Sequence, residues 1–267
     1  MKTLIKNLLL IISSIVVINC SKDNDNAPKG YFPKKIVIDN ILGGLSNSRE
    51  LTFIYNNNNL ITTINFDYTS GTISEESFKT IRLEYTQNND IKEIKTTSLN
   101  NKQTTTTFNH DDFGVITSIH FQGEESNFDM ITSYDPQSNM YTIDGDLANF
   151  PLEFNFDNKD VFYSISGSAV IDRNINFDNQ ETGPFKNLRQ QPELIIWSEI
   201  STFGSLTVNL YYLYPFKIEK VNFQSLNHRI FENFERDSND NLKSFSSRTL
   251  VAGVETNYTI EYQNRNL

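Results

Sequence analysis

The most restrictive feature of this chain is a short unit at residues 51–66, LTFIYNNNNLITTINF. Apolar residues alternate up to Tyr55, four asparagines follow, and an apolar run restarts at Leu60. This pattern is typical of a strand, a tight turn and a second strand. The outline returns from Ile81, Thr104, Leu152, Phe231 and, as a half unit, Tyr258. Each unit has an aromatic residue, a polar turn and then an aliphatic residue, and the aromatic positions are Tyr55, Tyr85, Phe108, Phe156, Phe234 and Tyr262.

These units predict an all-β fold, a long curled antiparallel β-meander with one short interrupting helical segment near 184–203. Turn signals recur about every ten residues without a fixed period, which favours an irregular sheet that curls on itself over a solenoid or propeller. Glycine follows the turn only at Gly114. Strands are expected at 35–40, 50–56, 60–68, 79–87, 91–98, 103–109, 115–121, 129–134, 139–144, 151–156, 161–166, 206–214, 216–224, 228–235, 242–249 and 256–263.

The interruption begins with a polar stretch at 178–188, and Pro192 then opens ELIIWSEISTF. Ile196, Ile200 and Phe203 fall at helical spacing, and Gly204 stands where a helix would end. The pattern predicts a helix over 193–203 that covers the concave or open face of the sheet, with Trp197 as its packing anchor. A buried strand over 194–197 is the alternative.

Residues 1–19 are typical of a secretory signal peptide, because two lysines precede an apolar run from Leu8 to Ile18. Eleven residues are too few to cross roughly 30 Å of hydrocarbon as a helix. Cys20 follows at once and is the only cysteine, so it has no partner for an internal disulfide. Residues 20–32 are expected to hold an acylated cysteine and a flexible tether. Residues 33–267 are expected to form a single antiparallel β domain.

Val17-Ile18-Asn19-Cys20 resembles the lipobox of bacterial lipoproteins, although Asn19 departs from the usual small residue. The resemblance implies that Cys20 carries palmitate-type acyl chains, which would bind the protein to the outer membrane. The following Ser-Lys-Asp run resembles the start of Bacteroidota lipoproteins that are displayed on the cell surface. A plain soluble spacer explains the run equally well, so an outward and a periplasmic domain both remain open.

The repeated units resemble Bacteroidota envelope lipoproteins of unknown function with YD-repeat and DUF4595-type domains. Tyr134-Asp135 is a literal YD dipeptide, and Phe156-Asp157 and Phe177-Asp178 are close variants. The segment 183–187, GPFKN, before the expected helix also carries the likeness. The resemblance covers most of residues 50–267 and implies an all-β sheet without a known active site.

Composition limits the partners. The formal charge is −10, and removal of residues 1–19 with their two lysines makes it −12 (−10 − 2). So acidic a chain would be repelled by phosphate backbones, which argues against nucleic acid. Aromatic residues make up 12% of the chain, which favours sheet over disorder.

The search for chemistry yields no catalytic residue, no metal site and no cofactor. His110-Asp111-Asp112 is expected in a turn, where aspartate is favoured for backbone geometry, and His120 is expected on a strand face. Residues 237–241, DSNDN, have oxygen ligands at alternate positions but lack the glycine and glutamate of a calcium loop, so a hairpin turn is expected.

The densest aromatic cluster is formed by Tyr211, Tyr212, Tyr214 and Phe216, which could stack on sugar rings; cross-strand packing is their ordinary role. Trp197 is a further candidate binding residue. The expected function is therefore that of a non-catalytic binding or envelope-assembly module, with a glycan, a peptide or an envelope protein as partner. A hydrolase whose site combines distant acidic residues is the alternative. A lipid carrier with a hollow sheet is a third hypothesis.

Overall fold

The computed structural model describes residues 29–42, 45–75, 77–124, 126–145, 152–156, 160–165, 171–188, 192–203, 213, 215–223, 229–249 and 253–267. Its strands are β1 Lys29–Leu42, β2 Leu45–Tyr55, β3 Ile61–Ser70, β4 Phe78–Tyr85, β5 Ile91–Ser98, β6 Gln103–His110, β7 Ile116–Gln122, β8 Asn127–Asp135, β9 Met140–Gly145, β10 Leu152–Phe156, β11 Asp160–Ile165, β12 Ile171–Thr182, β13 Phe216–Phe223, β14 Arg229–Arg236, β15 Leu242–Thr249 and β16 Glu255–Asn266. A helix, α2, spans Pro192–Phe203 between β12 and β13.

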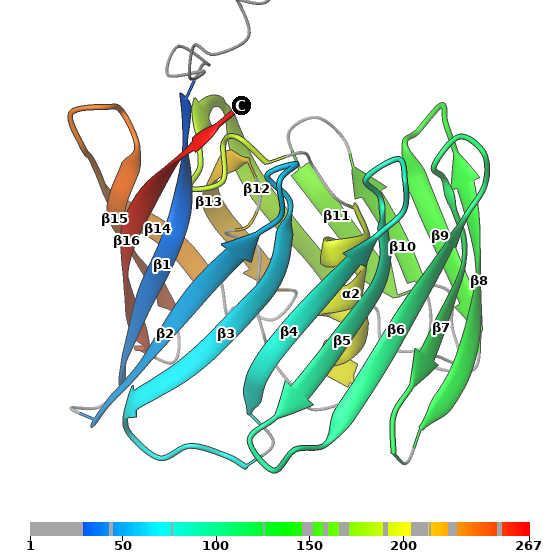
Figure 1. Ribbon diagram of the computed structural model, residues 1–267, viewed down its shortest axis with the longest axis horizontal. Helices are drawn as coiled ribbons and strands as arrows, with labels where there is room; N and C mark the ends of the chain where they lie inside the picture. Colours follow the sequence, from blue (N-terminus) through cyan, green and yellow to red (C-terminus); the bar gives the residue numbers. More distant parts are fainter. Residues whose placement is uncertain are drawn as a thin grey trace, which may run out of the picture. The chain divides into compact units, whose positions relative to one another are not determined.

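Residues 31–263 form one compact unit, and its strands pair in chain order as an antiparallel sheet (Figure 1). The expected all-β meander with one short helix is confirmed. The 16 strands close into a barrel because β1 also pairs with β16. Lys35 of β1 binds Glu50 of β2 at 3.3 Å and Glu261 of β16 at 2.8 Å, and Thr256 of β16 donates to Asn40 of β1.

The interior of the barrel is apolar. Alternate residues along the strands are buried, as in β5, where Ile94 is buried while Lys95 is exposed. Because successive strand residues point to opposite faces, this alternation sends isoleucine and phenylalanine inward and charges outward. The largest fully buried side chains are Trp197, Phe32, Phe108, Phe154, Phe185, Ile36, Ile38, Leu51, Ile64, Ile81 and Ile91.

Four hairpins end in five-residue turns of one design, at residues 56–60, 86–90, 111–115 and 237–241. All four follow even-numbered strands of the up-and-down sheet and therefore lie at the same end of the barrel, which we call the turn end. In each turn a side-chain oxygen of the first residue accepts hydrogen bonds from the backbone N–H groups of the third and fifth residues. The accepting residues are Asn56, Thr86, Asp111 and Asp237, with distances of 2.8–3.2 Å.

The fourth residue of each of these turns has a positive φ. Gly114 has φ 81°, and the other three positions hold Asn59 at 62°, Asn89 at 67° and Asp240 at 59°. Asparagine and aspartate enter the left-handed region more readily than other non-glycine residues, which explains why the repeated units dispense with glycine. The structure also confirms a hairpin turn at residues 237–241.

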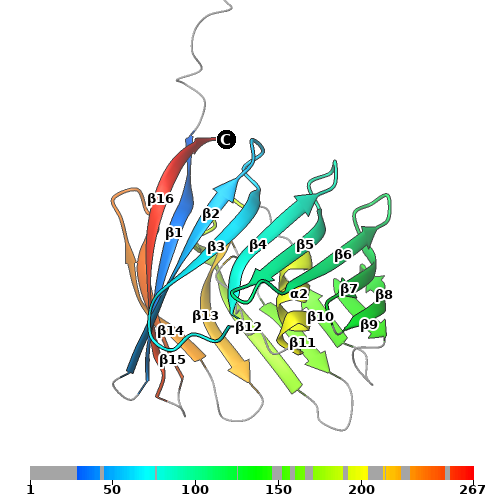
Figure 2. The same ribbon diagram turned by 60° about the horizontal axis from the view of Figure 1, so that its bottom comes forward.

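The helix lies in the space that the strands enclose (Figures 1 and 2). The predicted helix over 193–203 is confirmed as α2. Its described side chains from Glu193 to Ser198, and Ile200, are buried. The helix therefore packs within the barrel rather than over an open face. The strand expected at 206–214 lies largely outside the described residues. β12 was not predicted.

Candidate functional site

The last strand residue before each five-residue turn makes a side-chain contact with another part of the chain. The register shifts by one residue there, between Ile54 and Tyr55 and again between Glu84 and Tyr85. Tyr55 donates its hydroxyl to Pro33 O at 2.7 Å, and Tyr85 donates to Ile61 O at 2.6 Å. In these two hairpins the tyrosine therefore ties one strand end to a neighbouring strand.

In the other two hairpins the same position holds His110 and Arg236, each again at a register shift. His110 pairs with Glu193 of α2, whereas Arg236 contacts Glu181 and Thr182 at the end of β12. Of the four equivalent positions, one thus binds the helix α2 and another binds the end of β12, the strand that precedes α2 in the chain. Sequence reasoning placed His110 within a turn; in the structure it is the final residue of β6, and the turn begins at Asp111.

His110 and Glu193 form a buried pair. The distance from His110 Nε2 to Glu193 Oε1 is 2.9 Å, and the two side chains are 6% and 4% exposed. Glu193 lies in the first turn of α2, where the helix dipole stabilises a carboxylate. Tyr141 is also close: burial raises its pKa to about 12, and the negative charge of Glu193 adds to the effect. The pair has groups suited to proton transfer, but both are covered by surrounding residues, and its evident role is to fix α2.

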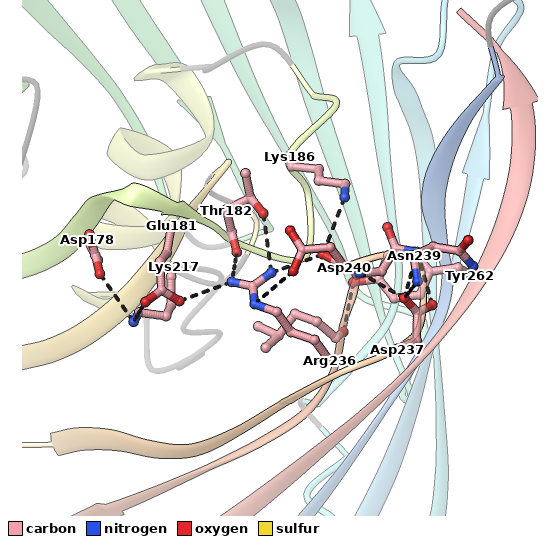
Figure 3. A network of polar contacts seen from close by, with 12 residues as sticks. Asp178, Glu181, Thr182, Lys186, Lys217, Arg236, Asp237, Asn239, Asp240 and Tyr262 are labelled. Atoms are coloured by element: carbon pink, nitrogen blue, oxygen red, sulfur yellow. Dashed lines mark hydrogen bonds and ion pairs between the residues drawn. The ribbon is translucent and has the colours of Figure 1, made fainter.

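The second cluster joins β12, β13 and the 237–241 turn (Figure 3). Lys217 binds Asp178 at 3.2 Å and Glu181 at 3.0 Å, and its Nζ lies 5.1 Å from the centre of the Phe234 ring. Arg236 binds Glu181 at 3.2 Å and donates to Thr182 O at 2.9 Å. The cluster therefore holds the end of β12, from which the chain leaves toward α2.

These cations lower the pKa values of the neighbouring carboxyl groups. Lys217 holds the pKa of Glu181 below its ordinary value, and Arg236 adds to this effect. The pKa of Asp178 is lowered by the backbone N–H of Gln180 and by Lys217. At neutral pH the cluster is therefore a network of ionised groups in which each cation has a carboxylate partner.

Of the residues proposed from sequence for binding, Trp197 and Phe216 lie in the described part of the chain. Phe216 is the first residue of β13. Trp197 is 1% exposed, and its ring lies 5.9 Å from that of Phe78. Trp197 thus has the position of a packing anchor and cannot stack on an external sugar without movement of α2. Tyr211, Tyr212 and Tyr214 lie outside the described residues, as does Cys20.

The remaining histidine with a described contact, His120, lies on β7 and pairs with Asp129 at 2.6 Å on the outer face. Within the ranges described above, no group of three or more His, Cys, Asp or Glu residues is arranged to hold a metal ion. No helix among those residues is long and apolar enough to span a membrane.

Sequence reasoning missed both pairings around the helix. A usable signal was present, because His110 and Arg236 stand directly before turns that begin with aspartate, as Tyr55 stands before Asn56. When the four units are aligned on the first residue of each turn, and not on the aromatic residue, Tyr55, Tyr85, His110 and Arg236 occupy the same position. Phe108 and Phe234, the aromatic residues of their units, lie two positions before His110 and Arg236.

Comparison with known proteins shows the fold and no family. No protein-family model matches the chain, and no curated protein matches it. A porin-like protein from Bacteroides uniformis has a similar structure, with a TM-score of 0.51 and 15% identity over 86% of this chain and 96% of its own. A porin-like protein from Bacteroides vulgatus aligns over 88% of this chain and 99% of its own, with 12% identity and a TM-score of 0.47. The first likeness supports the same barrel fold.

Proposed function

We propose that this chain is a lipid-anchored protein of the bacterial cell envelope, and that its barrel stands in water as a non-catalytic binding or assembly module. The observation that carries the proposal is the polarity of the barrel wall. A barrel that spans a bilayer turns an apolar band outward and a polar surface inward. Among the described residues the buried core is apolar, and charged side chains such as Lys95 and Glu84 lie on the outer face. The large apolar strand residues that are exposed there are Ile41, Ile54 and Ile131.

The charges stand in the middle of strands as well as at their ends. Lys95 of β5 pairs with Glu84 of β4 at 3.4 Å, and Arg248 of β15 pairs with Glu232 of β14 at 2.8 Å. A lysine or arginine on the lipid face of a barrel costs roughly 2–4 kcal/mol at the bilayer midplane. Such positions favour contact of the outer wall with water.

The anchor rests on the sequence. Cys20 follows an apolar run and precedes a polar stretch, an arrangement that resembles a lipobox apart from Asn19. Each buried methylene of an acyl chain contributes about 0.8 kcal/mol, so more than one chain gives lasting membrane attachment. With a water-facing barrel, such an anchor would attach the N-terminus to the outer membrane and leave the domain free to meet a partner.

The anchor is tested by metabolic labelling with an alkynyl palmitate analogue in a bacterial host. Wild type and Ser21→Ala should be labelled and processed, since both keep the cysteine. Cys20→Ser should carry no label and should retain the signal segment. Labelling of Cys20→Ser at the wild-type level would refute the anchor.

Protease treatment of intact cells then decides which side the domain faces. Loss of a C-terminal tag from intact cells would support display on the outer surface, with a glycan, a peptide or an external protein as partner. Survival of the tag until the outer membrane is broken would support a periplasmic domain with an envelope-assembly partner. The acidic charge argues against nucleic acid in either case.

The YD-repeat and DUF4595-type resemblance fits this proposal through its hairpin motifs, and it too assigns no ligand. A hydrolase would need two carboxyl groups held across a cleft. Glu193 is a buried carboxyl group, but it is paired with His110 and covered by surrounding residues. We therefore keep the hydrolase as the alternative and the binding module as the proposal.

A further inference from the structure

One aromatic side chain projects into solvent at the turn end. Phe113 is 93% exposed, the greatest exposure of any large apolar side chain among the described residues. It is the third residue of its five-residue turn, and no strand or helix covers it. The same position in the other three turns holds asparagine, at Asn58, Asn88 and Asn239.

The turn that carries Phe113 has a defined conformation. Asp111 accepts the backbone N–H groups of Phe113 and Val115, each at 2.9 Å. A Cβ atom on Gly114 would lie 3.1 Å from Oδ2 of the buried Asp90, so the 86–90 turn packs closely against this turn. Phe113 is therefore held outward by fixed backbone geometry.

The start of the barrel domain lies at the same end. The ring of Phe32 in β1 packs against that of Tyr55, with centres 5.5 Å apart, and Tyr55 donates to Pro33 O at 2.7 Å. Tyr55 is the residue directly before the 56–60 turn. The chain that precedes β1 therefore joins the barrel at the turn end.

The length of that preceding chain limits which end of the barrel can meet an anchoring membrane. Cys20 precedes Tyr31 by eleven residues, and Leu42, at the other end of β1, follows Tyr31 by eleven. Eleven residues span at most about 37 Å when fully extended and about 18 Å on average as a flexible chain. The strand covers about 36 Å over the same number of residues. A membrane attached at Cys20 could therefore meet the opposite end only if the linking chain ran fully extended back along the barrel.

We propose that the turn end is the surface that faces the membrane, and that Phe113 enters the lipid headgroup region there. The inference rests on the lipid anchor proposed above and deepens it, because it assigns the orientation of the barrel and a residue that contacts lipid. Aromatic side chains suit the boundary between headgroups and acyl chains. The neighbouring Asp112 is exposed and would be repelled by anionic lipid, so this surface fits zwitterionic headgroups.

Three tryptophan substitutions at exposed apolar positions test the orientation. Phe113→Trp reports on the turn end. Leu99→Trp reports on the opposite end, since Leu99 follows β5 and is 37% exposed, and Ile131→Trp reports on the outer wall, where Ile131 of β8 is 72% exposed. Each full-length acylated variant would be placed on vesicles of phosphatidylcholine and phosphatidylethanolamine, with and without bromine on the acyl chains. Wild type supplies the background emission of the buried Trp197.

Bromine on acyl chains quenches tryptophan that lies close to them, whereas acrylamide quenches tryptophan that is exposed to water. The emission added by Phe113→Trp should be largely lost on brominated vesicles and shielded from acrylamide. Leu99→Trp and Ile131→Trp should keep their emission on brominated vesicles and remain open to acrylamide. Vesicle-bound Phe113→Trp without bromine quenching, or equal quenching at positions 113 and 99, would overturn the proposal.

Flotation of the vesicles separates failure of the orientation from failure of the anchor. Protein that floats with its vesicles while position 113 is unquenched would refute the orientation and leave the anchor intact. Protein that does not float would refute the anchor, and the orientation that rests on it would fall with it.

Discussion

Asparagine and aspartate occupy the left-handed position in three of the four turns at the turn end. Asn59, Asn89 and Asp240 take the place that Gly114 holds in the third turn. The side chain of the first turn residue fixes the loop by accepting two backbone N–H groups, as Asn56 does from residues 58 and 60. Such Asx geometry provides a hairpin connection without a glycine at every turn.

The positive φ of Asn59 predicts different effects for two substitutions at this position. Asn59→Ala should lower the free energy of unfolding by about 1 kcal/mol, because alanine is disfavoured at positive φ. Asn59→Gly should stay within a few tenths of wild type, since glycine tolerates that conformation. Urea denaturation measures both. An equal loss of stability in the two variants would mean that side-chain contacts of Asn59, and not its backbone conformation, determine the effect of substitution.

The cluster around Glu181 predicts a pH dependence. Its folded-state pKa lies below the ordinary 4.5, so its stabilising effect is complete above that value and is lost as the pH falls through the lowered pKa. Glu181→Gln should be less stable than wild type at pH 7 by roughly 1 kcal/mol or less, since the carboxylate is partly exposed. The difference should disappear in strong acid. Urea midpoints at several pH values test this, and a difference independent of pH would contradict it.

At the scale of the element, the hairpins are linked to one another through the residue before each turn. Tyr85 of β4 donates to Ile61 O of β3, and Tyr55 of β2 donates to Pro33 O of β1. At the same position, His110 contacts Glu193 of α2 and Arg236 contacts Thr182 at the end of β12. The residue before the turn thus makes one of two kinds of contact, either with another strand of the barrel or with the helix inside it.

The hydrogen bonds that these tyrosine hydroxyl groups donate to neighbouring strands can be tested without a change in packing. Tyr85→Phe keeps the ring and removes the hydroxyl that donates to Ile61 O, so it should cost about 1 kcal/mol. Tyr55→Phe, which loses the bond to Pro33 O, should cost a similar amount. Thermal or urea unfolding of both variants measures the effect. Wild-type stability in both would show that the hydroxyl groups exchange these bonds for equivalent bonds with water.

The sequence predicted the hairpins because their alternation and turn residues are local. It missed β12, where Asn176 and Asp178 interrupt the apolar pattern and favour a turn assignment. In the structure Ile175 and Phe177 of that strand are buried, and pairing with β11 and β13 outweighs the local preference. The helix was predictable from its spacing. Its partner His110 was not, because the contact joins residues 83 positions apart.

At the scale of the whole barrel, closure and polarity are the features that matter for function. Curling of the sheet follows from its length, but closure depends on contacts between β1 and β16, such as Lys35 with Glu261, that no local pattern encodes. The outward charges were visible in the alternation of the strands. Which face of the strands points to the interior became clear only from the barrel, because a closed sheet has an inner and an outer surface.

The proposed water-facing wall is tested by the distribution of the barrel between membrane and water when the proposed lipid anchor is absent. A variant in which residues 1–20 are replaced by a cleavable signal peptide without a cysteine would be compared with wild type by membrane fractionation and carbonate extraction. Our account predicts that wild type stays with the membrane and that the variant is a folded barrel in the aqueous fraction without detergent. A variant that remains in the membrane and needs detergent for release would contradict it.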